Sequence, residues 1–138
     1  MDNKRIFIVE DDADLLYGLE AQFTSDEFMV EMATGEEEIE ELLTQMKDFD
    51  PAYVILDLIL PKLDGFEIIK KMKADDELND RQIFIFTDVS DEDSRQRSLD
   101  LGADYFFFKD DFDTFQFAEK VKKIIANQEK AEERDYEE

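Results

Sequence analysis

The sequence predicts an α/β fold: a three-layer sandwich in which a parallel sheet lies between two layers of helices. Short and wholly apolar runs recur along the chain, as expected for strands that helices cover on both faces. Segments with helical spacing of apolar residues alternate with these runs, and right-handed crossovers then give a parallel five-stranded sheet. The four clear runs are residues 6–9, 53–56, 83–86 and 105–108, and a weaker fifth run lies at residues 28–32.

Helices are expected after each of the five strands. The apolar residues that predict them lie within residues 15–23, 39–46, 69–72, 99–101 and 117–125. Their spacing of three to four residues places them on one face of each helix. The fourth helix, at residues 91–101, has only Leu99 and Leu101 as apolar anchors, so we expect it to be marginal and mobile. Gly102 is expected to end it.

Length and composition favour one folded domain with a charged end. The chain has 138 residues, of which 43% are hydrophobic, and this is enough for a single core. Residues 127–138 are mostly charged and lack the apolar stripe of the preceding helix. We therefore expect them to extend the last helix beyond the core and to fray.

Charge and missing residue types exclude several functions. The chain carries 16 basic against 39 acidic residues, and its net charge of −23 repels nucleic acids and anionic membranes. It contains no Cys and no His, which excludes disulfides, thiolate catalysis and imidazole metal ligands. The first apolar run is too short for a signal peptide or a membrane span, so we expect a cytoplasmic protein.

Polar residues follow the predicted strands at the edge where open α/β sheets bind ligands. They are Glu10, Asp11 and Asp12 after the first strand, Asp57 after the third, Thr87 after the fourth and Lys109 after the fifth. Crowded carboxylates need a cation, and oxygen ligands suit Mg²⁺. Phosphoryl transfer needs a nucleophile, a metal and donors to the phosphoryl oxygens, and this set contains candidates for each.

Each of these residues has a simpler interpretation when it is taken alone. An Asp at the end of a strand most often caps a helix or forms a turn, as Asp12 or Asp14 is expected to do for the first helix. Thr87 would only end a strand, and Lys109 would only reach solvent from the sheet edge. Chance placement of all these groups at one edge is much rarer, so the set favours a functional site.

The sequence resembles the receiver domains of response regulators in two-component signalling. The matching segments are residues 6–12, 54–65, 84–87 and 102–109, which include Pro61 and Gly65 after the acidic residue of the third strand. The resemblance spans residues 4 to about 126 and implies a single receiver domain at residues 1–126 with a chemotaxis-regulator-like fold. It also implies the flavodoxin-like strand order 2-1-3-4-5.

The resemblance implies a phosphorylation site with bound Mg²⁺. Asp57 corresponds to the aspartate that takes a phosphoryl group from a histidine kinase. Asp11 corresponds to a direct metal ligand and Glu10 to a holder of metal-bound water, and Asp57 and the backbone carbonyl of Ile59 complete the ligand set. Such a protein is a signalling switch that catalyses only its own phosphorylation and dephosphorylation, and is not a conventional enzyme.

The resemblance also implies how a signal leaves the site. Thr87 and Lys109 correspond to groups that bind the phosphoryl oxygens, and Phe106 corresponds to the switch aromatic that turns inward as Thr87 moves. The surface of the fourth helix, the fifth strand and the last helix would then bind an unknown downstream protein or effector domain. The implied phosphodonor is a sensor histidine kinase or a phosphotransfer protein.

Two residues depart from the family pattern. Asp88 follows Thr87 at a position where the family usually has a small residue. Asp110 follows Lys109 at a position where the family usually has Pro in a cis peptide. These departures motivate an alternative function, a receiver-like interaction module that signals without phosphorylation.

A third hypothesis is a Mg²⁺-dependent phosphohydrolase with Asp57 as its covalent nucleophile. Such an enzyme needs a second carboxylate as acid and base, and the two residues that follow are Leu58 and Ile59. We therefore expect no turnover of a generic phosphate ester.

Overall fold

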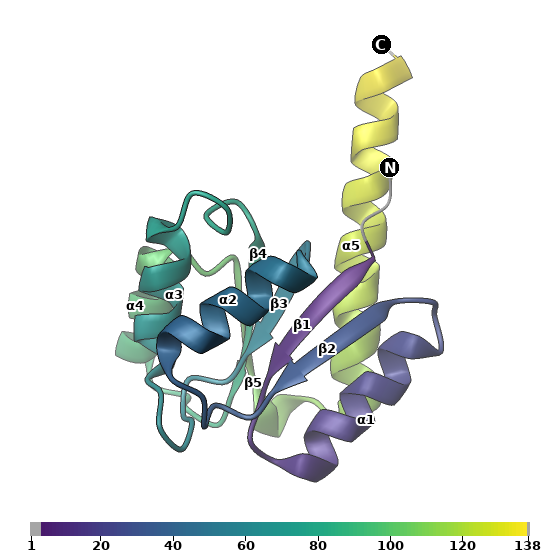
Figure 1. Ribbon diagram of the computed structural model, residues 1–138. Helices are drawn as coiled ribbons and strands as arrows, with labels where there is room; N and C mark the ends of the chain where they lie inside the picture. Colours follow the sequence, from purple (N-terminus) through teal and green to yellow (C-terminus); the bar gives the residue numbers. More distant parts are fainter. Residues whose placement is uncertain (1–3, 138) are drawn as a thin grey trace.

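The computed structural model describes residues 4–137 and confirms the predicted three-layer α/β sandwich (Figure 1). The five strands are β1 (Arg5–Val9), β2 (Met29–Ala33), β3 (Tyr53–Leu56), β4 (Gln82–Thr87) and β5 (Tyr105–Phe108). Neighbouring strands all pair in parallel, in the order β2-β1-β3-β4-β5. This is the flavodoxin-like order that the family resemblance implied.

Five helices and one short 3-10 turn follow the strands within the described residues. They are α1 (Ala13–Thr24), α2 (Ile39–Phe49), α3 (Gly65–Ala74), α4 (Glu92–Leu101), the turn η1 (Lys109–Asp111) and α5 (Thr114–Glu137). Figure 1 shows α1 and α5 on one face of the sheet and α2, α3 and α4 on the other. Both faces are covered, which explains why the strands are apolar along their length.

Alternate residues of β1, an inner strand of the sheet, enter two separate hydrophobic clusters. In β1, Phe7 and Val9 pack in the cluster that contains the apolar residues of α2 and α3. Ile6 and Ile8 pack in the cluster that contains those of α1 and α5. All four side chains are fully shielded from solvent. Successive residues of a strand point to opposite faces, so a strand between two helical layers has no polar face.

Aspartate side chains cap the N-termini of α1, α3 and α4. Asp12 accepts a hydrogen bond from the backbone N–H of Leu15 at 3.2 Å and is the N-cap of α1. Asp64 and Asp91 cap α3 and α4 in the same way. These side chains bond N–H groups that have no partner within the helix. Of the two caps considered for α1, Asp12 is the correct one, and Asp14 lies within the first turn.

Few apolar residues attach α4 to the rest of the molecule. Ser98 is its only buried residue. The guanidinium of Arg97 lies over the ring of Phe66 in α3, 4.1 Å from the ring centroid. Gly102 follows the helix with a φ of 121°, a conformation that favours glycine. The weak apolar anchoring agrees with the sequence, and the mobility of α4 stays a prediction.

The last helix extends past the core. Among the side chains described, which reach residue 133, Ile125 is the last one buried. The helical backbone nevertheless continues to Glu137, and Figure 1 shows its final turns projecting from the body. Fraying of residues 127–138 stays a prediction, and residue 138 lies outside the described part. No described helix, including this one, is long and apolar enough to cross a membrane.

Candidate functional site

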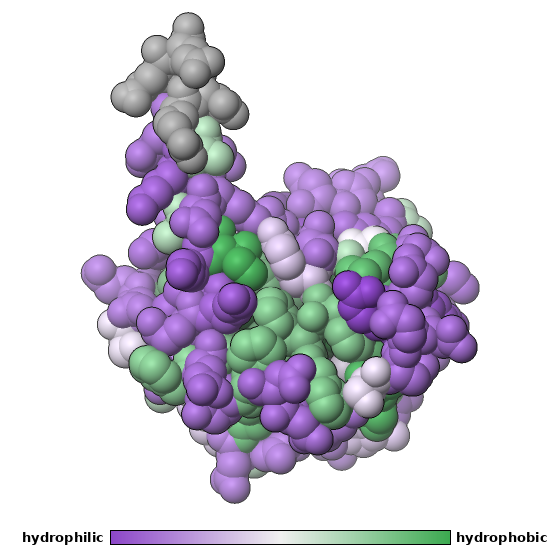
Figure 2. All heavy atoms as spheres, turned by 180° about the vertical axis from the view of Figure 1, so that it is seen from behind, coloured by the Kyte–Doolittle hydropathy of each residue, from purple (hydrophilic) through white to green (hydrophobic). Residues whose placement is uncertain are grey.

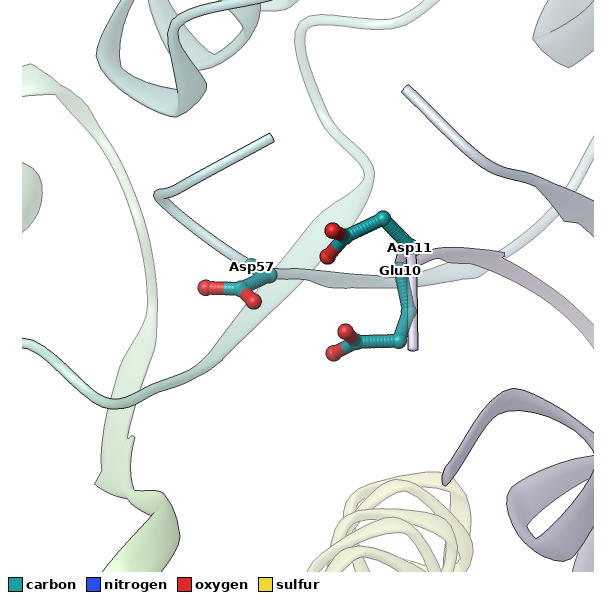
Figure 3. A group of neighbouring side chains, drawn as sticks. All are labelled: Glu10, Asp11 and Asp57. Atoms are coloured by element: carbon teal, nitrogen blue, oxygen red, sulfur yellow. The ribbon is translucent and has the colours of Figure 1, made fainter. Parts of the chain in front are cut away.

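Four strand ends bring polar residues together at the C-terminal edge of the sheet. Glu10 and Asp11 follow β1, Asp57 follows β3, Thr87 ends β4 and Lys109 follows β5. Figure 3 shows the carboxylates of Glu10 and Asp11 pointing toward Asp57. One oxygen of each lies within 4.8 Å of the others. The fold therefore gathers the predicted acidic residues, the hydroxyl and the lysine in one site.

The backbone ladder of the sheet continues past the strands and fixes the two buried carboxylates. The N–H of Glu10 donates to the carbonyl of Ala33 at 3.0 Å. The N–H of Asp57 donates to the carbonyl of Val9 at 3.1 Å. Because these bonds hold the Cα positions, the direction of each side chain is set by the sheet and not by a flexible loop.

Asp57 is surrounded by hydrogen-bond donors. Its side chain is 5% exposed. Oδ1 accepts from the hydroxyl of Thr87 at 2.7 Å and from the N–H of Ile59 at 3.2 Å. Oδ2 accepts from the ammonium of Lys109 at 2.9 Å. Both carboxylate oxygens thus have protein partners, and the donors come from β4, from the loop after β3 and from the end of β5.

Glu10 is a buried carboxylate with an unusual ionisation. Its Oε1 lies 2.9 Å from the ammonium of Lys109, and its Oε2 accepts from the N–H of Asp12 at 3.1 Å. Burial raises the pKa of Glu10 to about 7, and the negative charge of Asp57 adds to this effect. The bonds from Lys109 and Asp12 lower that pKa but do not cancel the effect of burial.

Lys109 remains an ammonium in this site. Burial by itself lowers the pKa of Lys109, because it disfavours the charged form. Hydrogen bonds to Asp57 and Glu10 outweigh burial and raise the pKa above its ordinary value. One ammonium is therefore shared by two buried carboxylates, while the third carboxylate of the cluster, Asp11, is exposed.

The donor set fits a hard divalent cation. Three carboxylates with converging oxygens and no nitrogen or sulfur ligand are the chemistry that Mg²⁺ prefers. Three carboxylates in this cluster face one ammonium, that of Lys109, so ionised carboxylates leave an excess of negative charge in the site. Two carboxylates are buried and one is exposed to solvent, so an ion can reach the site and still keep bound water.

Two other predicted site residues lie around this cluster. Ile59 is 60% exposed and contributes its N–H to Asp57. The role of its carbonyl as a metal ligand stays a prediction. Phe106 is half-buried in β5, packs against the cluster that contains the apolar residues of α2 and α3, and pairs with Ile85 in β4. It therefore lies beside the strand that ends in Thr87, and its role as a switch also stays a prediction.

The two departures from the family pattern leave the site intact. Asp88 and Asp110 are both exposed. Within residues 4–137 no peptide bond is cis, so the position before Asp110 is trans. Lys109 opens the turn η1 and still reaches two carboxylates at 2.9 Å. The turn thus carries Lys109 into the pocket with a trans peptide before Asp110.

Three contacts of the site had no counterpart in the sequence interpretation. They are the bond from Lys109 to Glu10, the bond from the N–H of Asp12 to Glu10, and the bond from the N–H of Val89 to the Thr87 hydroxyl at 3.4 Å. Two of them are backbone donors, which any residue type supplies. The third depends on the direction of a side chain across two strands, for which a sequence carries no signal.

Fold and site together define a flavodoxin-like α/β protein with an oxygen-only acidic pocket. The sequence profile of the response regulator receiver domain matches residues 6–122. The chain belongs to this family. A receiver domain is a signalling switch and not a conventional enzyme.

Known proteins agree with this assignment. The response regulator ArlR of Staphylococcus aureus is 30% identical over 125 residues, which are 90% of this chain and 53% of ArlR. The chain spans about half the length of the curated relatives it matches. A CheY-like receiver from Methanospirillum hungatei has a TM-score of 0.78 at 25% identity, with 94% of this chain and 99% of that one covered. The Mn²⁺-bound response regulator Rcp1 has the same fold, with a TM-score of 0.73 at 19% identity, covering 86% and 91%.

Proposed function

We propose that the chain is a phospho-accepting receiver that takes a phosphoryl group on Asp57 from a sensor histidine kinase or a phosphotransfer protein. The observation that carries this proposal is the setting of Asp57, a buried carboxylate with Lys109 and Thr87 on its two oxygens and two further carboxylates beside it. A nucleophile, a metal site and donors for phosphoryl oxygens are all within one pocket. Phosphotransfer from such a kinase implies a cytoplasmic location.

The reaction exchanges one bond to phosphorus for another. An oxygen of Asp57 forms a bond to phosphorus as the bond from phosphorus to the donor nitrogen breaks. The electron pair of the broken bond stays on that nitrogen, which takes up a proton. Lys109 and Thr87, freed from the carboxylate oxygens, then bond the phosphoryl oxygens. Their positions on opposite oxygens of Asp57 place one donor on each side of the new group.

Mg²⁺ would be held by the carboxylates of Asp11 and Asp57, by Glu10 through bound water and by the carbonyl of Ile59. When bound, it would offset the negative charge of the phosphoryl oxygens. Excess negative charge in the pocket supports this role, because a cation relieves the repulsion that helps to raise the pKa of Glu10.

The output surface is proposed to be the one formed by α4, β5 and α5. All four residues of β5 are aromatic and half-buried, although the strand lies at the edge of the sheet. Figure 2 shows apolar side chains gathered on this side of the molecule, between α4 and α5. Thr87 is linked to the loop before α4 through the N–H of Val89, and Phe106 lies next to its strand. Movement of Thr87 toward a phosphoryl group would therefore change this surface for a downstream protein or effector domain.

The test is phosphorylation by a small donor. The protein is incubated with acetyl phosphate and Mg²⁺, and its mass is measured. We expect the gain of one phosphoryl group, its loss in alkali as for an acyl phosphate, and no gain in Asp57→Asn. Addition of beryllofluoride with Mg²⁺ is expected to shift the NMR signals of α4 and β5 only when Asp57 is present. An intact, folded protein that responds to neither reagent would overturn the proposal.

A second function is supported by one contact. The Thr87 hydroxyl already donates to Oδ1 of the unmodified Asp57 at 2.7 Å. A phosphoryl group on Asp57 would draw the hydroxyl in the same direction. A receiver in this arrangement would present its output surface without phosphorylation, as an interaction module. Equal binding of a downstream partner by wild type and Asp57→Ala would favour this function over the first.

A further inference from the structure

We propose that Glu37 is a positioning residue for the phosphorylation of Asp57. From outside the acidic pocket, its carboxylate fixes the loop between β2 and α2, and this loop holds the backbone that follows Asp57. The inference rests on the proposed function, because it concerns the reaction of the same aspartate. The two loops involved are the β2–α2 loop, residues 34–38, and the β3–α3 loop, residues 57–64.

One carboxylate holds the turn of the β2–α2 loop. Gly35 is buried in this loop and has a φ of 83°, a conformation that favours glycine. The half-buried side chain of Glu37 accepts two backbone hydrogen bonds, from the N–H of Gly35 at 3.0 Å and from the N–H of Thr34 at 3.4 Å. Hydrogen bonds to an ionised acceptor are stronger than those between neutral groups. Both oxygens of Glu37 thus fix the backbone on either side of the turn.

Gly35 contacts the β3–α3 loop in two ways. Its carbonyl accepts a hydrogen bond from the N–H of Lys62 at 3.2 Å. It also lies against Leu60, so closely that a Cβ added to Gly35 would be 2.8 Å from the Cβ of Leu60 and 2.9 Å from its Cδ2. Leu60 packs in turn against the hydrophobic cluster that contains the apolar residues of α2 and α3. The position of Gly35 therefore sets the position of the β3–α3 loop.

The β2–α2 loop is attached to both sides of the acidic pocket. On one side, Leu60 directly follows Ile59, whose N–H donates to Oδ1 of Asp57 at 3.2 Å. On the other side, Ala33 directly precedes the loop, and its carbonyl accepts the N–H of Glu10 at 3.0 Å. Displacement of the β2–α2 loop would therefore move Ile59 relative to Asp57 and change how the acceptor carboxylate is held.

The neighbouring glutamate is a matched control. Glu37 lies outside the group of three carboxylates in the pocket, but its charge could still act on that pocket at a distance. Glu36 carries the same charge, is exposed and lies in the same loop. The N–H groups of Thr34 and Gly35 donate to Glu37 and not to Glu36. Glu36→Ala therefore removes one negative charge from the loop and leaves the two hydrogen bonds in place.

The experiment compares wild type, Glu37→Ala, Glu37→Gln and Glu36→Ala in their rate of phosphorylation by acetyl phosphate at saturating Mg²⁺. A shift of about 1 Å at a reacting group slows a reaction by up to about a hundredfold, and for a smaller shift we expect a loss of about tenfold in Glu37→Ala. Glu37→Gln keeps one oxygen acceptor and should recover part of the rate. Glu36→Ala should react at the wild-type rate.

A second measurement reports the position of the loops without the reaction. In NMR spectra of the unphosphorylated protein, the amide signals of Ile59 and Lys62 should shift in Glu37→Ala and keep their positions in Glu36→Ala. A merely structural role of Glu37 would lower the free energy of unfolding in urea but leave the phosphorylation rate and both amide signals of the folded protein unchanged. That result would overturn the proposal. If Glu37→Ala does not fold, Glu37→Gln carries both measurements.

Replacement of Leu60 tests the connection from the other loop. Leu60→Ala removes most of the side chain that Gly35 contacts and leaves both bonds to Glu37 in place. Changes to residues that act through one contact are not additive. The double variant Glu37→Ala/Leu60→Ala should therefore lose less rate than the product of the two single losses. Losses that multiply would mean that the two residues act separately, which would refute the connection through Gly35.

The outcomes separate this inference from the proposed function. If wild type is phosphorylated and Glu37→Ala reacts at the same rate, the positioning role is refuted and the proposed function stands. If wild type is not phosphorylated, the proposed function fails, and the amide signals of Ile59 and Lys62 still decide whether Glu37 holds the β3–α3 loop.

Discussion

Replacement of Gly65 by Ala is expected to disturb the acceptor site through the backbone. Gly65 is the first residue of α3, and its N–H donates to the carbonyl of Leu58 at 3.1 Å. A Cβ at this position would lie 2.5 Å from the Cα of Leu58 and 3.0 Å from the carbonyl oxygens of Asp57 and Leu58. These atoms belong to the backbone that carries Asp57, so no side-chain rotation relieves the overlap.

The size of the effect follows from these distances. Carbon atoms in good contact lie about 3.5–4.0 Å apart, so the two segments must separate by about 1 Å. Overpacking of a well-packed region costs about 1–3 kcal/mol of unfolding free energy, and we expect the upper part of that range because both sides are backbone. A displacement of a reacting group by about 1 Å lowers a rate by up to about a hundredfold. Phosphorylation of Asp57 should therefore slow as well.

Two assays and one control test this reasoning. Urea unfolding measures the free energy of unfolding, and the rate of modification by acetyl phosphate measures the reactivity of Asp57. The control is Gly18→Ala in α1, where the added Cβ would lie 3.1 Å from a methyl group of the Thr114 side chain. That half-buried side chain needs to shift by only a few tenths of an ångström. Ala favours a helix over Gly by about 1 kcal/mol, so we expect a change within about 1 kcal/mol. Wild-type stability and rate in Gly65→Ala would refute the argument from close contact.

Three further predictions concern ionisation and packing. Because the pKa of Glu10 is raised to about 7, its carboxyl takes up a proton as the pH falls from 8 to 6 and then attracts a cation less. Calorimetry should show the Mg²⁺ affinity falling by about tenfold over this range. Glu10→Gln should remove this pH dependence. Asp104→Ala removes the acceptor of the Ile83 N–H at 2.8 Å and should lower the unfolding free energy in urea by about 1–3 kcal/mol, whereas an unchanged midpoint would mean that water replaces the carboxylate. The ring of Phe117 is fully buried and stacks on the ring of Phe86, with 3.8 Å between the ring centroids. Phe117→Ala should therefore lower the free energy of unfolding, measured by thermal unfolding, by about 3–5 kcal/mol. A loss below about 1 kcal/mol would contradict tight packing there.

The location of the pocket was predictable because strand ends in a parallel sheet meet at one edge. Asp57 and Thr87 each follow or end a wholly apolar run, so their positions relative to the sheet could be read from the sequence. The order of the strands in the sheet could not be read from the residues in this way. Alternation of strands and helices allows several orders, and the order 2-1-3-4-5 came only from the resemblance to receivers.

The contacts within the pocket were beyond sequence reasoning. The path of the chain after β5 decides where Lys109 points, and the 3-10 turn that directs it follows no residue pattern considered in advance. The ionisation of Glu10 depends on how deeply its carboxylate is buried, which only the folded structure shows. Residue identity thus predicted the chemistry of the pocket, but not that Lys109 pairs with both Glu10 and Asp57.

The projecting end of α5 would amplify small changes in the orientation of this helix. Glu137 lies twelve residues beyond Ile125, the last buried side chain described, and a helix rises by about 1.5 Å per residue, so this stretch of α5 is about 18 Å long. A tilt of roughly 10° at the body would move the tip of such a rod by about 3 Å. A probe attached near the tip would thus magnify small rearrangements of the domain into displacements that distance measurements resolve. The most remote part of the molecule would then be the most sensitive place from which to follow events at the sheet edge.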